Sequence, residues 1–190
     1  MLHMVLTGDV HIGKTTVCFK LVDWARQHGY AVCGILTQPF FDDQGVRLGL
    51  TVLDLASGER HDLARIAPTR SCSHSASDGP RVGPYRFEPA GLRWASAVLE
   101  RAVAESSDLL IVDEVGRLEL EQSAGLHEVL DLVAASGVPR TLWVVRRTLL
   151  DAFQRKLPGL RCVVLEATEA NRSALHLEIA QRLFADPSQE

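Results

Sequence analysis

The sequence contains no apolar run long enough to cross a membrane. Its longest uncharged apolar runs, such as residues 109–112 and 142–145, are far shorter than the roughly 20 residues that a bilayer-spanning helix needs. The N-terminus also lacks a basic stretch followed by a long apolar run and a small-residue cleavage site, the pattern of a secretory signal. We therefore expect no membrane partner and a cytoplasmic protein.

Cysteine is scarce, and the close pairs that mark redox or zinc sites are missing. The chain has four cysteines without a CxxC pair, and most lie inside apolar runs, which is typical of reduced, buried thiols. Cys72 differs because it lies beside His74 in a polar stretch. One cysteine and one histidine cannot complete a four-ligand zinc site without distant partners, so we interpret this stretch as a polar loop.

An excess of basic residues is absent as well. The chain has 20 Lys and Arg against 24 Asp and Glu, a formal net charge of -4, whereas nucleic-acid binders usually present a net basic surface. We therefore expect no nucleic-acid partner. No NKxD-like motif marks a regulatory GTPase, and nothing in the sequence indicates an obligate oligomer, so we expect a monomer.

Apolar runs alternate with helical repeats along most of the chain, which is the pattern of an α/β fold. A chain of 190 residues with 46% hydrophobic residues can build one core, so we expect a single domain, residues 1–190. The predicted strands cover residues 3–7, 31–38, 108–113, 140–146 and 160–165. The predicted helices cover residues 14–28, 92–103, 122–135, 148–156 (capped by Thr148) and 169–184. Together they predict a three-layer α/β/α fold, an open and mainly parallel sheet with helices on both faces.

Residues 39–87 interrupt this alternation. Turn signals at 42–45 and 56–59 flank a segment of alternating polarity, which predicts an inserted β-hairpin or meander. The Ser-, Pro- and Gly-rich stretch that follows predicts a loop at 68–84, leading into a short strand at 85–87. This insertion is too short to form a second domain.

The clearest motif is a glycine-rich loop at residues 8–16. Its sequence, GDVHIGKTT, satisfies the P-loop pattern G-x-x-x-x-G-K-[ST] and lies between a predicted strand and a predicted helix. In such a loop, backbone N–H groups and the helix N-terminus converge on a phosphate. The predicted nucleotide-binding residues are Gly8, Asp9, Val10, His11, Ile12, Gly13, Lys14, Thr15 and Thr16.

Several residues of this loop have separate expected roles. Gly8 and Gly13 let the backbone approach the phosphates in conformations that other residues avoid. Lys14, which we count as catalytic, places its charge between the β- and γ-phosphates, and the Thr15 hydroxyl coordinates Mg²⁺. We interpret His11, a bulky residue where many such loops carry glycine, as an exposed loop residue without a catalytic role.

A second motif ends the predicted strand at 108–113. The segment LLIVDEVGRLEL, residues 109–120, is an apolar run followed by two adjacent acids, as in a Walker B segment. We predict that Asp113 reaches Mg²⁺ from across the sheet, together with Thr15. Glu114 is then placed to polarise the attacking water.

Four segments together resemble those of the small P-loop nucleoside-triphosphatases first known from thermophiles, a family that also has a human relative. They are GDVHIGKTT, VDEVGRLEL, GVRLGLTVLDLASGERHDLAR and VGPYRFEPAGLRWASAVLERAVAESSDLLIVDE. The resemblance extends over about residues 4–180. It implies slow, Mg²⁺-dependent hydrolysis of ATP, GTP and other nucleoside triphosphates on a RecA-like or kinase-like P-loop fold.

The resemblance also implies roles for individual residues. Glu114 corresponds to the family's acid beside the Walker B aspartate, Thr37 to the threonine that ends the second strand, and Arg117 to a basic residue after the Walker B glycine. In the stretch VVRRT, Arg146 or Arg147 is similar to a strand-end arginine that would stabilise charge on the transferred phosphoryl group. Because neighbours on a strand face opposite sides, we expect only one of the two to point inward, and we choose Arg146 as catalytic.

Two other functions use the same phosphate site. A kinase would transfer the γ-phosphate to a small molecule beneath a mobile lid that carries arginines. Arginines do gather in the irregular region, at Arg60, Arg65, Arg70, Arg81 and Arg86. A nucleotide-dependent adaptor or switch would instead use the bound nucleotide to order the 68–84 loop for a partner. Both alternatives stay open beside hydrolysis, and the sequence does not indicate the preferred base.

Overall fold

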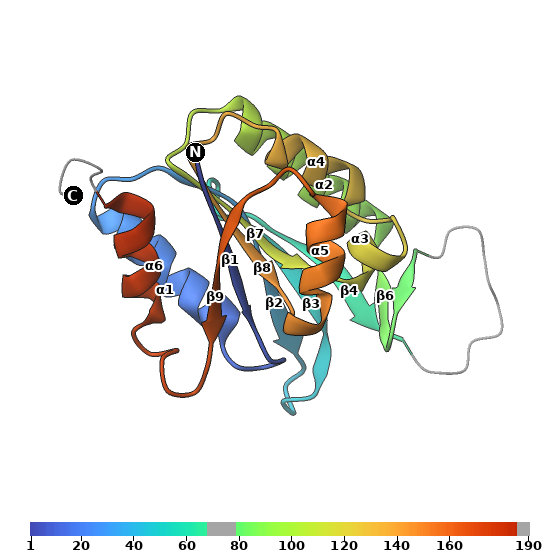
Figure 1. Cartoon of the computed structure of the whole chain (residues 1–190). Helices are drawn as coiled ribbons and strands as arrows, with labels where there is room; N and C mark the ends of the chain where they lie inside the picture. The colour runs from blue at the N-terminus through green and yellow to red at the C-terminus, as the bar shows by residue number, and fades with distance from the viewer. Residues whose placement is uncertain (68–78, 186–190) are drawn as a thin grey trace.

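The computed structural model describes residues 1–67 and 79–185, and five parallel strands form one half of its sheet, with the last of them at the edge (Figure 1). They are β1 (Leu2–Gly8), β2 (Val32–Phe41), β7 (Leu109–Val115), β8 (Arg140–Val145) and β9 (Cys162–Ala167). The predicted strands are confirmed, with ends that differ by a few residues. Most of these strands are buried runs of apolar residues, because helices cover both faces of a parallel sheet.

Antiparallel strands extend the sheet beyond β2, which confirms the predicted meander. They are β3 (Arg47–Asp54), β4 (Arg60–Ile66), β5 (Arg81–Val82) and β6 (Tyr85–Phe87). Asp54 fixes the turn between β3 and β4, because its buried carboxylate accepts hydrogen bonds from Ala56 N (2.9 Å) and Ser57 Oγ (2.7 Å). Arg101 Nη2 also donates to this carboxylate, at 2.5 Å, and so ties the turn to a helix behind the sheet.

The strand order brings the two predicted motifs to the same edge of the sheet. The strands follow the order β5-β6-β4-β3-β2-β7-β8-β1-β9. β8 therefore lies between β1, which leads into the glycine-rich loop, and β7, which ends in the acid pair. Because these strands are parallel, their carboxyl ends meet at one edge, where ligands of open α/β sheets bind.

Helices cover both faces of the sheet (Figure 1). On one face, α1 (Lys14–Gln27) and α6 (Leu175–Phe184) bury side chains such as Met4 and Leu6. The other face carries α2 (Pro89–Ala104), α3 (Arg117–Glu121), α4 (His127–Ala134) and α5 (Leu150–Lys156), with a 3-10 turn, Arg147–Leu149. Two cores on opposite faces of one sheet make the predicted three-layer α/β/α fold. In the part of the chain that the structure describes, no helix is long and apolar enough to cross a membrane.

Two helices begin later than the sequence predicts. The helix predicted at 122–135 begins at His127, because Ser123 (φ 50°) and Gly125 (φ 64°) have left-handed backbones that interrupt it after α3. The helix predicted at 169–184 begins at Leu175. Residues 169–174 form turns instead, because the Asn171 side chain accepts a hydrogen bond from Thr168 N (2.8 Å) and competes with helical bonding.

Smaller predictions have mixed outcomes. Thr148 does not cap a helix: it lies within the 3-10 turn, and α5 begins only at Leu150, so this prediction was wrong. Cys18 and Cys33 are buried free thiols and Cys162 is a partly buried one, as expected. Cys72 and His74, the weak metal candidates, lie outside the described residues.

Candidate nucleotide-binding site

The phosphate loop joins β1 to α1 in a backbone conformation that depends on glycine. Gly8 has φ 140° and Gly13 has φ 106°, which confirms the predicted need for glycine at both positions. A Cβ at Gly8 would lie 2.7 Å from the Ala167 carbonyl oxygen of β9. No side chain in the described part of the chain caps the α1 N-terminus, so its backbone N–H groups are available to an anion.

The side chains of the loop divide into exposed and buried ones. Asp9, Val10 and His11 are exposed, and His11 has a positive φ of 64°, as expected of an exposed loop residue. Lys14 is buried, and its Nζ donates hydrogen bonds to the carbonyls of Gly8 (3.1 Å) and Asp9 (2.8 Å). The lysine is therefore held inside the curve of the loop, where a phosphate would lie.

Burial and several nearby charges affect the pKa of Lys14, and their net effect lowers it. Loss of hydration on burial lowers the pKa of Lys14, while the nearby carboxylates of Glu114 and Asp113 raise it. The positive charge of Arg146 lowers this pKa further. These four side chains are therefore close enough to affect one another, although Lys14 begins α1 and the other three lie at the ends of two strands.

The buried Asp113 meets the phosphate loop across the sheet, as predicted. Its Oδ2 accepts a hydrogen bond from Thr15 Oγ1 (3.1 Å) and another from Thr37 N (3.2 Å). Thr37 Oγ1 also donates to the Asp113 main-chain carbonyl, at 2.6 Å. Burial, and next the charge of Glu114, raise the pKa of Asp113 to about 7. A carboxylate in this position is strongly stabilised by any cation that binds beside it.

Glu114 faces Arg146 at the end of β8. Arg146 Nε donates to Glu114 Oε1 at 2.6 Å and Nη2 donates to Oε2 at 3.1 Å, so the pair is bidentate. The hydrogen bond to Glu114 raises the pKa of Arg146, so the guanidinium stays charged. The structure therefore brings the predicted base and the predicted catalytic arginine into direct contact.

The two neighbouring arginines both reach the edge of the site. Arg147 donates to Glu166 Oε1 (2.8 Å) and also contacts the Asp9 carboxylate of the phosphate loop. Arg146 thus faces Glu114, while Arg147 pairs with two exposed carboxylates. Because β8 ends at Val145, strand alternation is not the cause of this difference, and the catalytic role of Arg146 stays a prediction. Arg117 instead lies exposed in α3, 3.8 Å from Glu121, and is not brought to the acid pair.

Four of the arginines considered for a lid lie in the antiparallel strands: Arg60 and Arg65 in β4, Arg81 in β5 and Arg86 in β6. Arg60 donates to Gln38 Oε1 at 2.7 Å, and Arg65 pairs with Asp62. Arg70 lies outside the described residues. These contacts place Arg60 and Arg65 on the antiparallel extension of the sheet.

The oxygens of Thr15 and Asp113 fit a magnesium ion that arrives with a polyphosphate. They are hard donors, 3.1 Å apart, and lie beside the open N-terminus of α1. Mg²⁺ in proteins usually takes one or two protein oxygens and completes its shell with water and phosphate oxygens. Within residues 1–67 and 79–185, no group of three or more His, Cys, Asp or Glu side chains could hold a metal alone.

Glu119 is a buried acid beside the site that the sequence analysis missed. Its carboxylate accepts hydrogen bonds from Gly116 N (3.0 Å) and Leu126 N (3.4 Å). Burial raises the pKa of Glu119. The signal was present in the segment GRLE, where an acid at the third helical position can bond back to the helix start.

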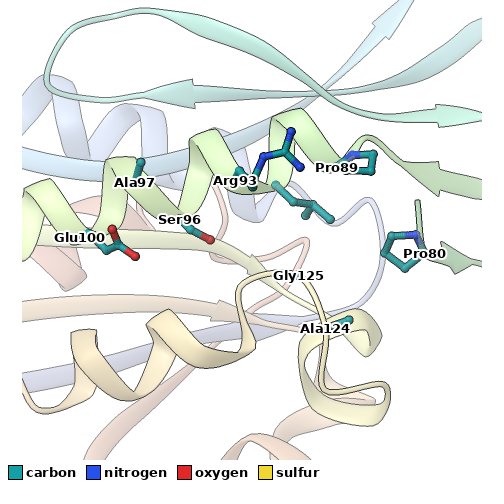
Figure 2. A pocket seen from close by; sticks show the side chains of 9 residues that line it. Pro80, Pro89, Arg93, Ser96, Ala97, Glu100, Ala124 and Gly125 are labelled. Atoms are coloured by element: carbon teal, nitrogen blue, oxygen red, sulfur yellow. The ribbon is translucent and has the colours of Figure 1, made fainter. Parts of the chain in front are cut away.

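A separate cavity of about 460 Å³ lies between α2 and the turn at 124–125 (Figure 2). Arg93, Ser96 and Glu100 of α2 form its polar side, and Pro80 lies at one end. No residue of the phosphate loop lines it. The cavity is therefore distinct from the site described above.

The phosphate loop, the buried aspartate that meets it and the parallel sheet define a P-loop nucleotide-binding protein. Comparison with known proteins agrees: residues 3–180 match the family described as NTPase, and the chain belongs to this family. Its enzyme class is therefore nucleoside-triphosphatase.

Curated relatives and solved structures extend the comparison. The chain is 41% identical to nucleoside-triphosphatase THEP1 of Methanopyrus kandleri over 127 residues, which cover 67% of this chain and 64% of that protein. It is 31% identical to the THEP1 of Methanothermobacter thermautotrophicus over 92% of both chains. The solution structure of a human cancer-related nucleoside triphosphatase superposes with a TM-score of 0.76 at 23% identity, over the whole of both chains. At 23% identity, this likeness shows that the two proteins share a fold and nothing more.

Proposed function

We propose that this protein hydrolyses nucleoside 5′-triphosphates, including ATP and GTP, to the diphosphate and phosphate with the help of Mg²⁺. The observation that carries the proposal is the 3.1 Å contact between Thr15 Oγ1 and the buried Asp113 carboxylate. Glu114 follows directly, so a base lies beside the two oxygens that suit Mg²⁺. The relatives named nucleoside-triphosphatase support the same reaction.

Lys14 and the loop N–H groups bind the β- and γ-phosphates in this proposal. Lys14 Nζ donates to two loop carbonyls, of Gly8 and Asp9. Hydrogen bonds to ionised acceptors are about twice as strong as those to neutral ones. Triphosphate oxygens therefore replace these carbonyls as acceptors when the nucleotide binds.

Thr15 and Asp113 would hold the metal through a hydroxyl and a carboxylate oxygen. When bound there, Mg²⁺ offsets the negative charge of the β- and γ-phosphates and orients them. Thr37 keeps the Asp113 carboxylate in position, because its N–H donates to Oδ2 (3.2 Å) while its hydroxyl donates to the Asp113 carbonyl (2.6 Å).

Glu114 accepts a proton from water as the water oxygen bonds to the γ-phosphorus. The bond from the γ-phosphorus to the bridging oxygen breaks, and its electron pair stays on the departing diphosphate. In the structure Arg146 holds both Glu114 oxygens, so the guanidinium has to move before the carboxylate can contact the attacking water. When the Arg146 side chain moves from Glu114 to the γ-phosphate, the Glu114 carboxylate becomes free to act as the base. The guanidinium then stabilises the negative charge on the phosphoryl group that is being transferred.

Release of inorganic phosphate from ATP or GTP, with Mg²⁺ and no acceptor, tests the proposal. We expect steady release by the wild type and a decrease of about 100-fold or more in Lys14→Ala, because the charge at the transferred phosphoryl group is lost. Arg155→Ala, which removes one exposed charge from α5, is the matched control and should behave as the wild type. If wild type and Lys14→Ala are equally inert while the wild type still binds nucleotide, hydrolysis is not the function.

The same assay separates the two alternatives. ADP formation that rises many times when a small-molecule acceptor is added would assign a kinase. A partner bound only in the presence of nucleoside triphosphate, together with negligible turnover, would assign a switch.

A further inference from the structure

The turn between β9 and α6, residues 168–174, lies against the outer side of the phosphate loop. Because β9 pairs with β1, Ala167 is level with Gly8, and the chain leaves β9 at the edge where the loop begins. Arg172 Nη1 donates to the Ile12 carbonyl at 3.3 Å. The 168–174 turn therefore forms a second wall beside the loop.

Internal hydrogen bonds hold this turn in shape. Asn171 Oδ1 accepts from Thr168 N (2.8 Å), and Asn171 Nδ2 donates to the Glu166 carbonyl (2.9 Å). Lys20 of α1 donates to the Ser173 carbonyl at 3.3 Å and ties the turn to the helix after the loop. Both ends of the Asn171 amide are therefore engaged within the turn.

The strand order indicates on which side of the loop the nucleoside lies. The groups that act on the γ-phosphate, Glu114 and Arg146, lie at the ends of β7 and β8. The sheet continues from there in the order β8-β1-β9. A triphosphate that begins above β7 and β8 and crosses the loop after β1 therefore leads its nucleoside toward β9 and the 168–174 turn.

Arg172 is the side chain of this turn that suits a nucleobase. It is exposed, and no ion pair holds its guanidinium in the part of the chain that the structure describes, whereas Arg146 and Arg147 both pair with carboxylates. A planar guanidinium stacks on aromatic rings, and bases bind to such platforms through their π faces.

We propose that Arg172 forms the platform on which the base of the bound nucleotide stacks. The inference rests on the proposed nucleotide site and adds a base subsite to it. Stacking uses the π face that every base has, and each end of the Asn171 amide already makes a hydrogen bond within the turn. The subsite therefore accepts adenine and guanine nucleotides with similar affinity.

Calorimetric titration with two kinds of ligand tests this role. The ligands are the Mg²⁺ complexes of non-hydrolysable ATP and GTP analogues, which carry a base, and of inorganic tripolyphosphate, which does not. For Arg172→Ala we expect Kd to rise about 5-fold to 100-fold for both nucleotide analogues, as for loss of one stacking contact. We expect the Kd of tripolyphosphate to stay within about twofold of the wild-type value.

Two further variants separate stacking from charge. Arg172→Lys keeps the charge but loses the plane, so it should resemble Arg172→Ala. Arg161 is also exposed and directly precedes the first residue of β9, at the end of the strand away from the phosphate loop. Arg161→Ala removes an equivalent charge there and should bind every ligand as the wild type does.

Other results overturn the inference in distinguishable ways. Equal losses for tripolyphosphate and nucleotide would show that Arg172 acts through the Ile12 carbonyl or on the phosphates. Full rescue by Arg172→Lys would show that only charge matters, and an unchanged Arg172→Ala would exclude any role. A wild type that binds none of the ligands would remove the proposed function itself.

Discussion

Asp113 and Glu119 are both buried acids, and at the scale of single residues their donors suit them to different tasks. Burial raises the pKa of both. Asp113 accepts from the main-chain N–H of Thr37 and from the hydroxyl of Thr15, and the hydroxyl is a donor that can turn away when a cation binds. Glu119 accepts from the main-chain N–H groups of Gly116 and Leu126, which cannot leave without unfolding the segment. We therefore expect the first carboxylate to bind a cation and the second to support the fold.

Arg146→Ala should separate catalysis from binding. We expect kcat for ATP to fall about 100-fold or more, because the charge that stabilises the transferred phosphoryl group is lost. Affinity for ADP should change little, since the diphosphate lacks the group that Arg146 would contact. Steady-state phosphate release and calorimetry with Mg²⁺·ADP measure the two quantities. An equal loss of ADP affinity would show that Arg146 supports the loop rather than the reaction.

At the scale of elements, the connection from β7 to α4 shows how one side chain shapes a site without belonging to it. The chain leaves β7 after Val115, forms α3 and turns sharply before His127. Glu119 bridges the start of α3 and the turn before α4 through Gly116 and Leu126. The path of the chain directly after β7 is therefore held by a buried carboxylate.

Glu119→Ala should destabilise the fold. Two main-chain N–H groups would lose their acceptor, which costs about 1–3 kcal/mol of unfolding free energy. Glu121→Ala is the matched control, because Glu121 is exposed and its contact with Arg117 is a 3.8 Å ion pair. That change should cost less than about 0.5 kcal/mol. Urea unfolding of both variants provides the comparison, and equal stabilities would contradict the structural role of Glu119.

At the scale of the whole molecule, one hydrophobic core covers each face of the sheet, and the site lies at the carboxyl ends of the parallel strands between the two cores. The core under α1 and α6 supports the phosphate loop, while the core around Trp143 supports the strand ends of Glu114 and Arg146. A ligand that contacts the loop and these strand ends links elements from both cores. Binding should therefore stabilise the chain as a unit.

Thermal unfolding should report this linkage. A non-hydrolysable triphosphate with Mg²⁺, at about 100 times its Kd, adds about 2.7 kcal/mol to the folded state. For a chain of this size that corresponds to a rise in Tm of roughly 5–10 °C. Excess EDTA should remove most of the rise, and Lys14→Ala should show little of it at the same ligand concentration. A rise that survives in both controls would place the ligand elsewhere.

The sequence by itself determined the elements and the chemistry they carry. The strands were predictable because buried parallel strands are continuous apolar runs, and the loop because Gly8 and Gly13 must adopt positive φ. The acid pair was predictable because it directly follows an apolar run, although β7 continues through both acids to Val115. The roles assigned to these residues stay predictions.

Tertiary structure decided which of these residues meet. Only the order of parallel strands places β8 between the loop and the acid pair, and so brings Arg146 onto Glu114. The late starts of α4 and α6 likewise depend on local hydrogen bonds and left-handed residues that helical periodicity does not register. The contact of Arg146 with Glu114 joins residues far apart in the chain, and its geometry follows from how the sheet is packed rather than from any local pattern.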